Sequence, residues 1–342
     1  MYNNNNTLTR IDISEKVEFL KNRNNYWDKA DEVTVVETHM SWVFITRDFV
    51  YKLKKPIRIN AYDMTTLEAR TVTCKEEVRL NRRLARDIYV GTTPLTVNDN
   101  GELQLGGKGK IVDWLVKMKR LPEKEKLDYA IENKTIPNRR ILKAAICLSE
   151  FYKKSPPAET NPDKHRKWLL ENIFKVRNTL KSKEYELSND LIEYNSSQQL
   201  RFIEKNAAIL DQRVLEGKII EAHGDLKPEH IYLSENPVII DCLEFKKELR
   251  ILYSAEELAF LAIGCEILGA SDIGKFFIDF YKYFANDNIP ENLFYFYKSK
   301  RACLRAKFAI SHTKETQYKH DPKWTKDANN YLLLAKKYAA QL

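Results

Sequence analysis

The feature that most limits how this chain can fold is a segment of its second half, residues 218–241, in which two aspartates follow short apolar runs. The first run leads into a polar turn that holds His223 and Asp225, and the last run ends on Asp241. Asp often occupies turns for purely conformational reasons. Two aspartates at the ends of short strands joined by tight turns can nevertheless converge on one point. There, one carboxylate accepts a proton from an attacking hydroxyl and the other holds a metal on a phosphate.

The same segment resembles a known family. The string His-Gly-Asp-Leu-Lys-Pro at 223–228, followed by Ile-Ile-Asp at 239–241, resembles the catalytic and metal-binding loops of aminoglycoside-phosphotransferase-like kinases, which are small-molecule relatives of the protein kinases. Residues 240–245 with the Glu-Glu-Leu-Ala string at 256–259 are similar to an uncharacterised bacterial branch of that family. The resemblance implies an α+β, bilobal protein-kinase-like fold. A small antiparallel sheet plus one helix would stand over a larger, mainly helical lobe, with the nucleotide in the cleft between them.

The length of the chain and its order of strand-like and helix-like segments agree with two lobes. A chain of 342 residues can bury a large core. We predict an N-terminal extension with a short helix at 1–30, packed onto the body by Trp27. An N-terminal nucleotide-binding lobe of strands is predicted at 31–121, because β-rich runs there are joined by short polar turns. A mainly helical catalytic lobe is predicted at 122–342, including a charged amphipathic helical stretch at 188–216.

Composition limits which cellular compartment and which binding partners we predict for this protein. No apolar run approaches the roughly 20 residues of a membrane helix, and the Asn-rich start of the chain is unlike a signal peptide. The five cysteines are scattered without a Cys-x-x-Cys pair, which indicates reduced thiols in the cytoplasm and no zinc site. The formal net charge of +9 suits an anionic ligand such as a nucleotide. Because the lysines form no dominant run, we do not predict a nucleic-acid or membrane partner.

A strand lysine and a helix glutamate are the candidate phosphate-holding pair. Lys52 lies within an apolar strand, where a charge is costly unless it is paired. Lys54 lies on the same face by period-2 alternation and is the second choice. Glu77 shares the inward face of the following helix, so it is the predicted partner of Lys52, as in kinases. The competing interpretations are an edge strand with exposed lysines and a surface salt bridge for Glu77.

Two further segments are predicted to contact the nucleotide. In protein kinases a glycine-rich loop covers the phosphates, whereas residues 37–42 of this chain contain no glycine. That turn still offers backbone N–H groups, His39 and Ser41 to a phosphate. In the family, the link between the lobes offers backbone groups to adenine, which by resemblance assigns Met118, Lys119 and Leu121 to that role.

The metal site departs from the family pattern. Asp241 is the predicted Mg²⁺ ligand, but His230 stands where these kinases usually carry an asparagine that binds a second metal. Magnesium prefers oxygen ligands, whereas imidazole suits a softer ion such as Mn²⁺. His230 is thus predicted to lie near the phosphates, and three roles are open. It turns away from the site and leaves one metal at Asp241, it binds a softer ion such as Mn²⁺, or it binds a phosphate as an imidazolium in place of the second cation. For Glu244, three roles are open: it faces the metal, it faces a cationic acceptor, or it is a carboxylate of the turn.

The function predicted from these residues is ATP-dependent phosphoryl transfer to a hydroxyl of an unidentified small-molecule acceptor. Asp225 acts as the base, His223 braces its loop, and ATP with Mg²⁺, or with Mn²⁺, supplies the phosphoryl group. The alternatives are a pseudokinase that binds a nucleotide without transfer, which the missing glycine loop favours, and transfer of AMP on the same fold.

Overall fold

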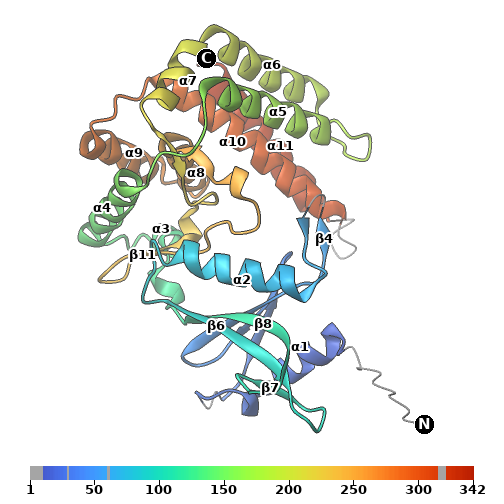
Figure 1. Cartoon of the computed structure of the whole chain (residues 1–342). Helices are drawn as coiled ribbons and strands as arrows, with labels where there is room; N and C mark the ends of the chain where they lie inside the picture. Colours follow the sequence, from blue (N-terminus) through green and yellow to red (C-terminus); the bar gives the residue numbers. More distant parts are fainter. Residues whose placement is uncertain (1–10, 29–30, 60–61, 315–320) are drawn as a thin grey trace. The chain divides into compact units, whose positions relative to one another are not determined.

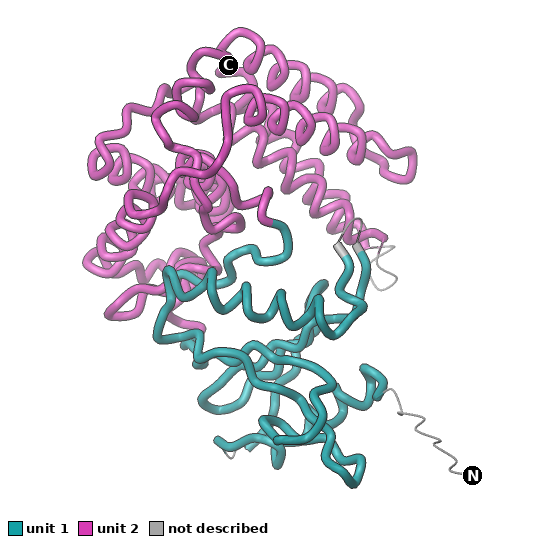
Figure 2. The backbone as a smooth tube through the Cα atoms, in the orientation of Figure 1, with its two compact units in different colours: residues 1–122, 239–246 teal, residues 123–238, 247–342 magenta. Residues whose placement is uncertain are grey.

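The structure is a computed structural model that describes residues 11–28, 31–59, 62–314 and 321–342. The predicted absence of a signal peptide concerns residues 1–10, which lie outside this range. The chain divides into two compact units (Figure 2): unit 1 comprises residues 1–122 and 239–246, and unit 2 comprises residues 123–238 and 247–342. The segment that carries Asp241 therefore belongs with the N-terminal part of the chain, although it lies within the sequence range predicted for the C-terminal lobe.

Unit 1 is built on a six-stranded antiparallel sheet with the strand order β1-β2-β3-β8-β6-β7. Helix α2 packs against β6 and β8 (Figure 1). The elements of unit 1 are α1 (Ile13–Lys21), β1 (Thr34–Glu37), β2 (Ser41–Ile45), β3 (Phe49–Lys54), β4 (Arg58–Ile59), β5 (Tyr62–Asp63), α2 (Leu67–Asn81), β6 (Tyr89–Val97), β7 (Leu103–Leu105) and β8 (Lys110–Lys119).

The alternation of side chains along β3 separates the apolar core of unit 1 from its charged groups. Tyr51 and Leu53 join the cluster that packs with α1 on one face of the sheet. Because successive side chains of a strand point to opposite faces, Lys52 and Lys54 point to the other face. Glu77 of α2 meets both lysines there. Trp27 contradicts its prediction, since it is 81% exposed and does not pack the N-terminal helix; its neighbour Tyr26 is buried instead.

Unit 2 is mainly helical, so the predicted α+β class with a small antiparallel sheet and a larger helical part is confirmed. No helix in the described part of the chain is long and apolar enough to span a membrane. The elements of unit 2 are α3 (Leu127–Glu132), α4 (Asn138–Lys154), α5 (Pro162–Leu180), α6 (Asn189–Lys205), α7 (Ala207–Leu215), β9 (Ile219–Glu221), β10 (Ile231–Tyr232), β12 (Ile251–Tyr253), α8 (Ser254–Ile267), α9 (Ser271–Ala285), α10 (Glu291–Ser311) and α11 (Pro322–Ala339), with β11 (Val238–Ile239) at the unit boundary.

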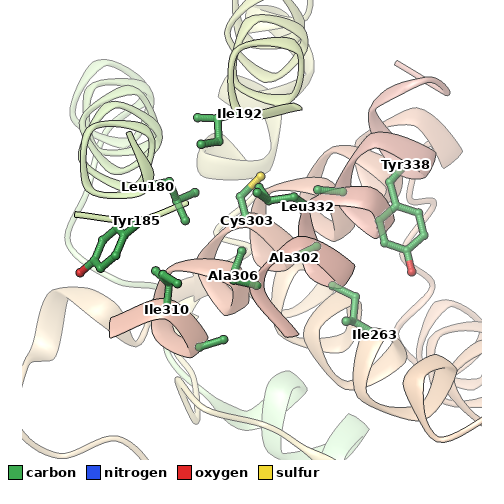
Figure 3. Packing of buried hydrophobic residues seen from close by; sticks show 13 residues of the cluster. Leu180, Tyr185, Ile192, Ile263, Ala302, Cys303, Ala306, Ile310, Leu332 and Tyr338 are labelled. Carbon is green, nitrogen blue, oxygen red and sulfur yellow. The ribbon is translucent and has the colours of Figure 1, made fainter. Parts of the chain in front are cut away.

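The core of unit 2 joins helices that are far apart in the sequence. Ile192 of α6, Ala306 of α10 and Leu332 of α11 are buried in one apolar cluster (Figure 3). Small residues on α10 let its neighbours approach closely, and α10 and α11 make the most extensive helix pair of this unit. Helices α8, α10 and α11, which line the cavity described below, are therefore fixed by a shared core.

One carboxylate ties α8 to the last two helices and yields a stability prediction. Glu266 accepts hydrogen bonds from Lys298 Nζ (2.8 Å), Lys337 Nζ (2.7 Å) and Tyr338 Oη (2.6 Å). Burial raises the pKa of Glu266, but these three donors outweigh it and lower that pKa to about 2. A lowered carboxylate pKa contributes stability above the ordinary value of 4.5, which is lost as the pH falls toward the folded-state value.

We therefore expect Glu266→Gln to lower the free energy of unfolding at pH 7 by about 1–2 kcal/mol, after allowance for solvent screening of a partly exposed group. The difference from the wild type should shrink between pH 4.5 and about pH 2. Urea unfolding at a series of pH values measures it, with Glu171→Gln on exposed α5 as the control. A difference that does not change with pH would assign the loss to packing instead of charge.

Candidate functional site

Five charged side chains of unit 1 form an alternating chain of ion pairs, which we call the ion ladder. Its order is Asp241, Lys52, Glu77, Lys54, Glu244. Lys52 Nζ lies 2.5 Å from Asp241 Oδ1 and 3.0 Å from Glu77 Oε1. Lys54 Nζ lies 2.5 Å from Glu77 Oε2 and 2.6 Å from Glu244 Oε1. Each oxygen of Glu77 therefore faces a different lysine, and the predicted pairing of Lys52 with Glu77 is observed.

The ion ladder is most deeply buried at its centre and most accessible at Asp241. The side chains of Glu77 and Lys54 are 1% and 4% exposed, whereas that of Asp241 is 46% exposed. Burial alone would lower the pKa of Lys52, but Asp241 and Glu77 outweigh it and raise that pKa well above its usual value. Glu244 and Glu77 likewise outweigh the effect of burial on Lys54 and raise its pKa, so both lysines stay charged. Burial raises the pKa of Glu244 above its usual value.

Asp241 is held in a backbone conformation that few residues adopt. Its φ is 67°, in the left-handed region, where Asp is tolerated better than most non-glycine residues. The N–H of Asp241 donates to Tyr89 Oη at 3.3 Å, and the next N–H, that of Cys242, donates to Asn81 Oδ1 at 2.9 Å. Such backbone strain is often found at functional sites. Here it aims an accessible carboxylate at Lys52.

The turn between β1 and β2 closes without glycine. Thr38 Oγ1 accepts a hydrogen bond from the N–H of Ser41 at 3.0 Å and donates to the carbonyl of Ser41 at 2.8 Å. No residue of this turn has a positive φ, so the conformation does not require glycine. Ser41 is buried beside Lys54, with which it pairs in the β2–β3 ladder, and His39 is exposed. The predicted contact of these two residues with a phosphate stays a prediction.

The predicted adenine-binding residues differ in what their backbone can offer. Met118 is paired with strands on both of its sides, and its side chain is buried. The N–H of Lys119 donates to the carbonyl of Ile88, and the N–H of Arg120 donates to the carbonyl of Asp48, both at 2.9 Å. Lys119 and Leu121 line an open depression of about 500 Å³ on unit 1. The backbone N–H groups of Lys119 and Arg120 therefore already form hydrogen bonds within the fold. The adenine-binding roles of Met118, Lys119 and Leu121 stay predictions.

In unit 2, a buried glutamate organises the turn that carries Asp225. Glu257 of α8 accepts the N–H of His223 at 3.2 Å and that of Gly224 at 2.6 Å, and Tyr152 Oη donates to it at 2.8 Å. Gly224 has a φ of 90°, which a residue with a Cβ would adopt only with strain. His223 is fully buried, and its Nδ1 accepts the N–H of Asp225 at 3.3 Å. His223 thus braces the turn, as the sequence suggested.

His230 also contacts this turn. Its Nδ1 lies 2.8 Å from the carbonyl oxygen of Asp225, so Nδ1 carries the proton and donates it. The distance from Nδ1 to Asp225 Oδ2 is 4.0 Å. Lys227 Nζ lies 3.2 Å from the same oxygen of Asp225. The role of His230 at a metal stays a prediction, and the observed contact gives it a second role in holding the loop.

Sequence reasoning missed Glu257 and did not resolve Glu244. A signal for Glu257 was present, because Glu256 and Glu257 stand in the first turn of an otherwise mostly apolar helix and a buried carboxylate needs a partner. The partner of Glu257 is the backbone of the turn that holds Asp225. Glu244 pairs with Lys54, and its roles at a metal, at a cationic acceptor or in the turn stay predictions.

The residues present suit a magnesium ion of the kind that a nucleotide brings with it. Within the described residues, no group of three or more His, Cys, Asp or Glu side chains is arranged to hold a metal by itself. Mg²⁺ is usually bound by one or two carboxylates together with substrate phosphates and water. Asp241 supplies one hard, accessible oxygen ligand of this type. The donor set therefore fits a metal that arrives with phosphate.

Comparisons with known proteins give the following relatives. No family model matches the chain. The chain is 30% identical over 311 residues to uncharacterized proteins of Mycobacterium bovis and Mycobacterium tuberculosis, in a match that covers 89% of this chain. The match covers 59% of those proteins, so the chain spans somewhat more than half of the length of these curated relatives.

Solved structures share the architecture at low sequence identity. A choline kinase from Cryptosporidium parvum has a TM-score of 0.58 at 11% identity, covering 97% of this chain and 96% of its own. A choline/ethanolamine kinase family protein from Mesorhizobium loti has a TM-score of 0.56 at 10% identity, with 94% of each chain covered. The GDP complex of aminoglycoside 2'-phosphotransferase-IIIa has a TM-score of 0.50 at 13% identity, covering 90% and 93%. The chain therefore has the protein-kinase-like fold of the aminoglycoside-phosphotransferase-like kinases, as the resemblance implied.

Proposed function

We propose that this protein is a phosphotransferase that moves the γ-phosphoryl group of ATP to a hydroxyl of a small-molecule acceptor. The observation that carries the proposal is the accessible end of the ion ladder. There, a strand lysine, Lys52, is held between the helix carboxylate of Glu77 and the strained aspartate Asp241. This combination of lysine, glutamate and aspartate is what kinases use to hold the phosphates and a metal.

In the proposed reaction, each residue has a defined task. Lys52 binds phosphate oxygens, and Glu77 keeps Lys52 charged and oriented. Asp225 accepts a hydrogen bond from the acceptor hydroxyl and takes its proton as the oxygen attacks the γ-phosphorus, so that ADP leaves. Lys227, which is already 3.2 Å from Asp225, stabilises negative charge beside that carboxylate. The β1–β2 turn, with the exposed His39 and the buried Ser41, is proposed to cover the phosphates.

A Mg²⁺ ion bound with ATP would neutralise charge on the phosphates, and Asp241 is the residue proposed to hold it. His230 is proposed to keep the loop of Asp225 in place through the carbonyl contact, and to lie near the phosphates. An imidazole is a better donor to Mn²⁺ than to Mg²⁺. A change of metal preference in His230→Asn would therefore assign it a direct role.

A second candidate function is nucleotide binding without transfer. The observation that favours it is the β1–β2 turn, in which the side chain of Ser41 is buried and the glycines that let a backbone approach phosphates closely are absent. AMP transfer on the same fold is the third candidate. The three candidate functions differ in which phosphorus of ATP is transferred to an acceptor: the γ-phosphorus, the α-phosphorus or none.

The test uses the full chain with ATP labelled at the γ or the α phosphorus and a panel of hydroxylated metabolites. We expect the γ label, and not the α label, to appear in an acceptor. ADP should form only when acceptor and Mg²⁺ are both present. Transfer of the α label would replace the proposal with AMP transfer. Binding of ATP with no label transferred to any acceptor would favour the nucleotide-binding module.

A further inference from the structure

Unit 2 contains a cavity of about 250 Å³ next to the turn of Asp225. Its walls come from α3, from the residues that follow Asp225, and from α8, α10 and α11. Lys227 lines the cavity and connects it to the turn, because its Nζ lies 3.2 Å from Asp225 Oδ2 and 3.3 Å from Glu229 Oε1. A molecule in this cavity is thus one side chain away from the carboxylate that we propose as the base.

Arg305 gives the cavity a cation that is available to a ligand. Its Nε and Nη2 donate to Tyr331 Oη at 3.2 and 3.0 Å. Among the described residues, no carboxylate forms an ion pair with Arg305, whereas Lys227 is paired with two. A guanidinium has about five N–H donors in a planar fork, so most of them are left for a ligand. Such a fork matches the two oxygens of a carboxylate or a phosphate.

The guanidinium of Arg305 lies over the two aromatic rings of the cavity lining. The Arg305 guanidinium carbon lies 5.9 Å from the ring centre of Phe260 and 5.3 Å from that of Tyr331. Quaternary ammonium ligands are recognised by aromatic faces through cation–π contact. Because Arg305 occupies these faces, and because it is itself positive, the cavity does not suit a choline-like acceptor.

Acidic residues in the lining of the cavity limit how much negative charge a ligand can carry. Asp128 of α3 lines it, with its Oδ1 accepting the N–H of Tyr129 at 2.8 Å, and Glu132 of the same helix is an exposed neighbour. These carboxylates repel a polyanion, while Lys227 compensates Glu229. The volume lies below the roughly 300 Å³ at which pockets for drug-sized ligands begin. A small molecule with a single anionic group fits both the charge and the size.

We infer that the acceptor of the proposed reaction is a small hydroxylated anion, a hydroxy acid or a sugar-phosphate-like compound, whose carboxylate or phosphate binds Arg305 while its hydroxyl reaches Asp225. This inference rests on the proposed function for the role of the ligand as acceptor. The binding part stands apart from it, since Arg305 binds the anion whether or not transfer follows.

The test measures binding to the full chain without nucleotide, by calorimetry, for four probes: glycerate, glycerol 3-phosphate, glycerol and choline. We expect at least one of the two anions to bind and the neutral and cationic probes not to bind. Arg305→Gln should weaken binding of the anion roughly 10–100-fold, as loss of a charged, bidentate contact does. Arg305→Lys, which keeps the charge without the fork, should lose less. Arg201→Gln, the same change at an exposed position of α6, is the matched control and should have no effect.

Circular dichroism of each variant separates a loss of the ligand contact from a loss of folding, and Tyr331→Phe provides a milder change that only frees the guanidinium. If neither anion binds the wild type, or if choline binds better than the anions, the inference is overturned. Equal binding by wild type and folded Arg305→Gln also overturns it. Anion binding that depends on Arg305 without any transfer of the γ label would instead refute the proposed function and leave the anion site in place.

Discussion

Replacing Asp225 with alanine is expected to slow phosphoryl transfer by on the order of 10²–10⁴-fold, the usual contribution of a positioned general base. Nucleotide affinity should change little, because the residues proposed to hold the phosphates, Lys52 and Glu77, are untouched. The turn should survive the change, since Glu257 holds it through the N–H groups of His223 and Gly224 and not through the Asp225 side chain. Single-turnover kinetics with γ-labelled ATP, together with an independent measurement of ATP binding, give both quantities.

Two matched variants make this prediction sharper. Asp225→Asn keeps the size of the side chain but not its basicity, so it should be nearly as slow as Asp225→Ala. Asp163→Ala, at an 89% exposed aspartate of α5, should retain wild-type turnover. If Asp225→Asn kept most of the activity, the carboxylate would only orient the acceptor. If Asp225→Ala turned over like the wild type, another residue would be the base.

The candidate site residues of β3 and α2 could be predicted from the sequence, because a charged side chain at an inward-facing position is costly unless it has a partner. Lys52 is a charge within an apolar strand, and Glu77 lies on the inward face of α2, while its neighbour Glu76 pairs with Arg79 on the surface. Period-2 and helical spacing decide such questions from local sequence alone. The α+β class was implied by the family resemblance, and the change along the chain from strand-like to helix-like patterns agreed with it.

Part of what the sequence did not reveal depends on long-range contacts and part on a local break in a helix. Lys54 and Glu244 are 190 positions apart, so nothing local identified them as partners, and the two lysines were treated as alternatives when Glu77 in fact serves both. The stretch 188–216 was predicted as one helical region, whereas Asn206 separates α6 from α7 and donates its side-chain amide to the carbonyl of Phe202 at 3.0 Å. Asn competes for backbone hydrogen bonds in this way.

The second large effect is expected at the centre of the ion ladder. Glu77→Gln removes the negative charge between two buried lysines, which are then left with one carboxylate each at the outer ends. Removing one partner of a buried ion pair usually costs about 3–5 kcal/mol, because the remaining charge is uncompensated. We expect a loss of this size in the free energy of unfolding, measured by urea denaturation, and a weaker affinity for ATP.

Double-mutant cycles distinguish the tasks of the two lysines. Lys54 is the more deeply buried, with a side chain 4% exposed against 14% for Lys52, so Glu77→Gln combined with Lys54→Met should cost less stability than the sum of the single changes. Coupled neighbours typically deviate from additivity by about 0.5–3 kcal/mol. The cycle of Glu77→Gln with Lys52→Met should instead show its coupling in ATP affinity, because Lys52 lies beside the accessible Asp241. Strict additivity of stability in the Lys54 cycle, together with strict additivity of ATP affinity in the Lys52 cycle, would mean that Glu77 organises neither lysine. Coupling of ATP affinity in the Lys54 cycle alone would transfer the phosphate-binding role from Lys52 to Lys54.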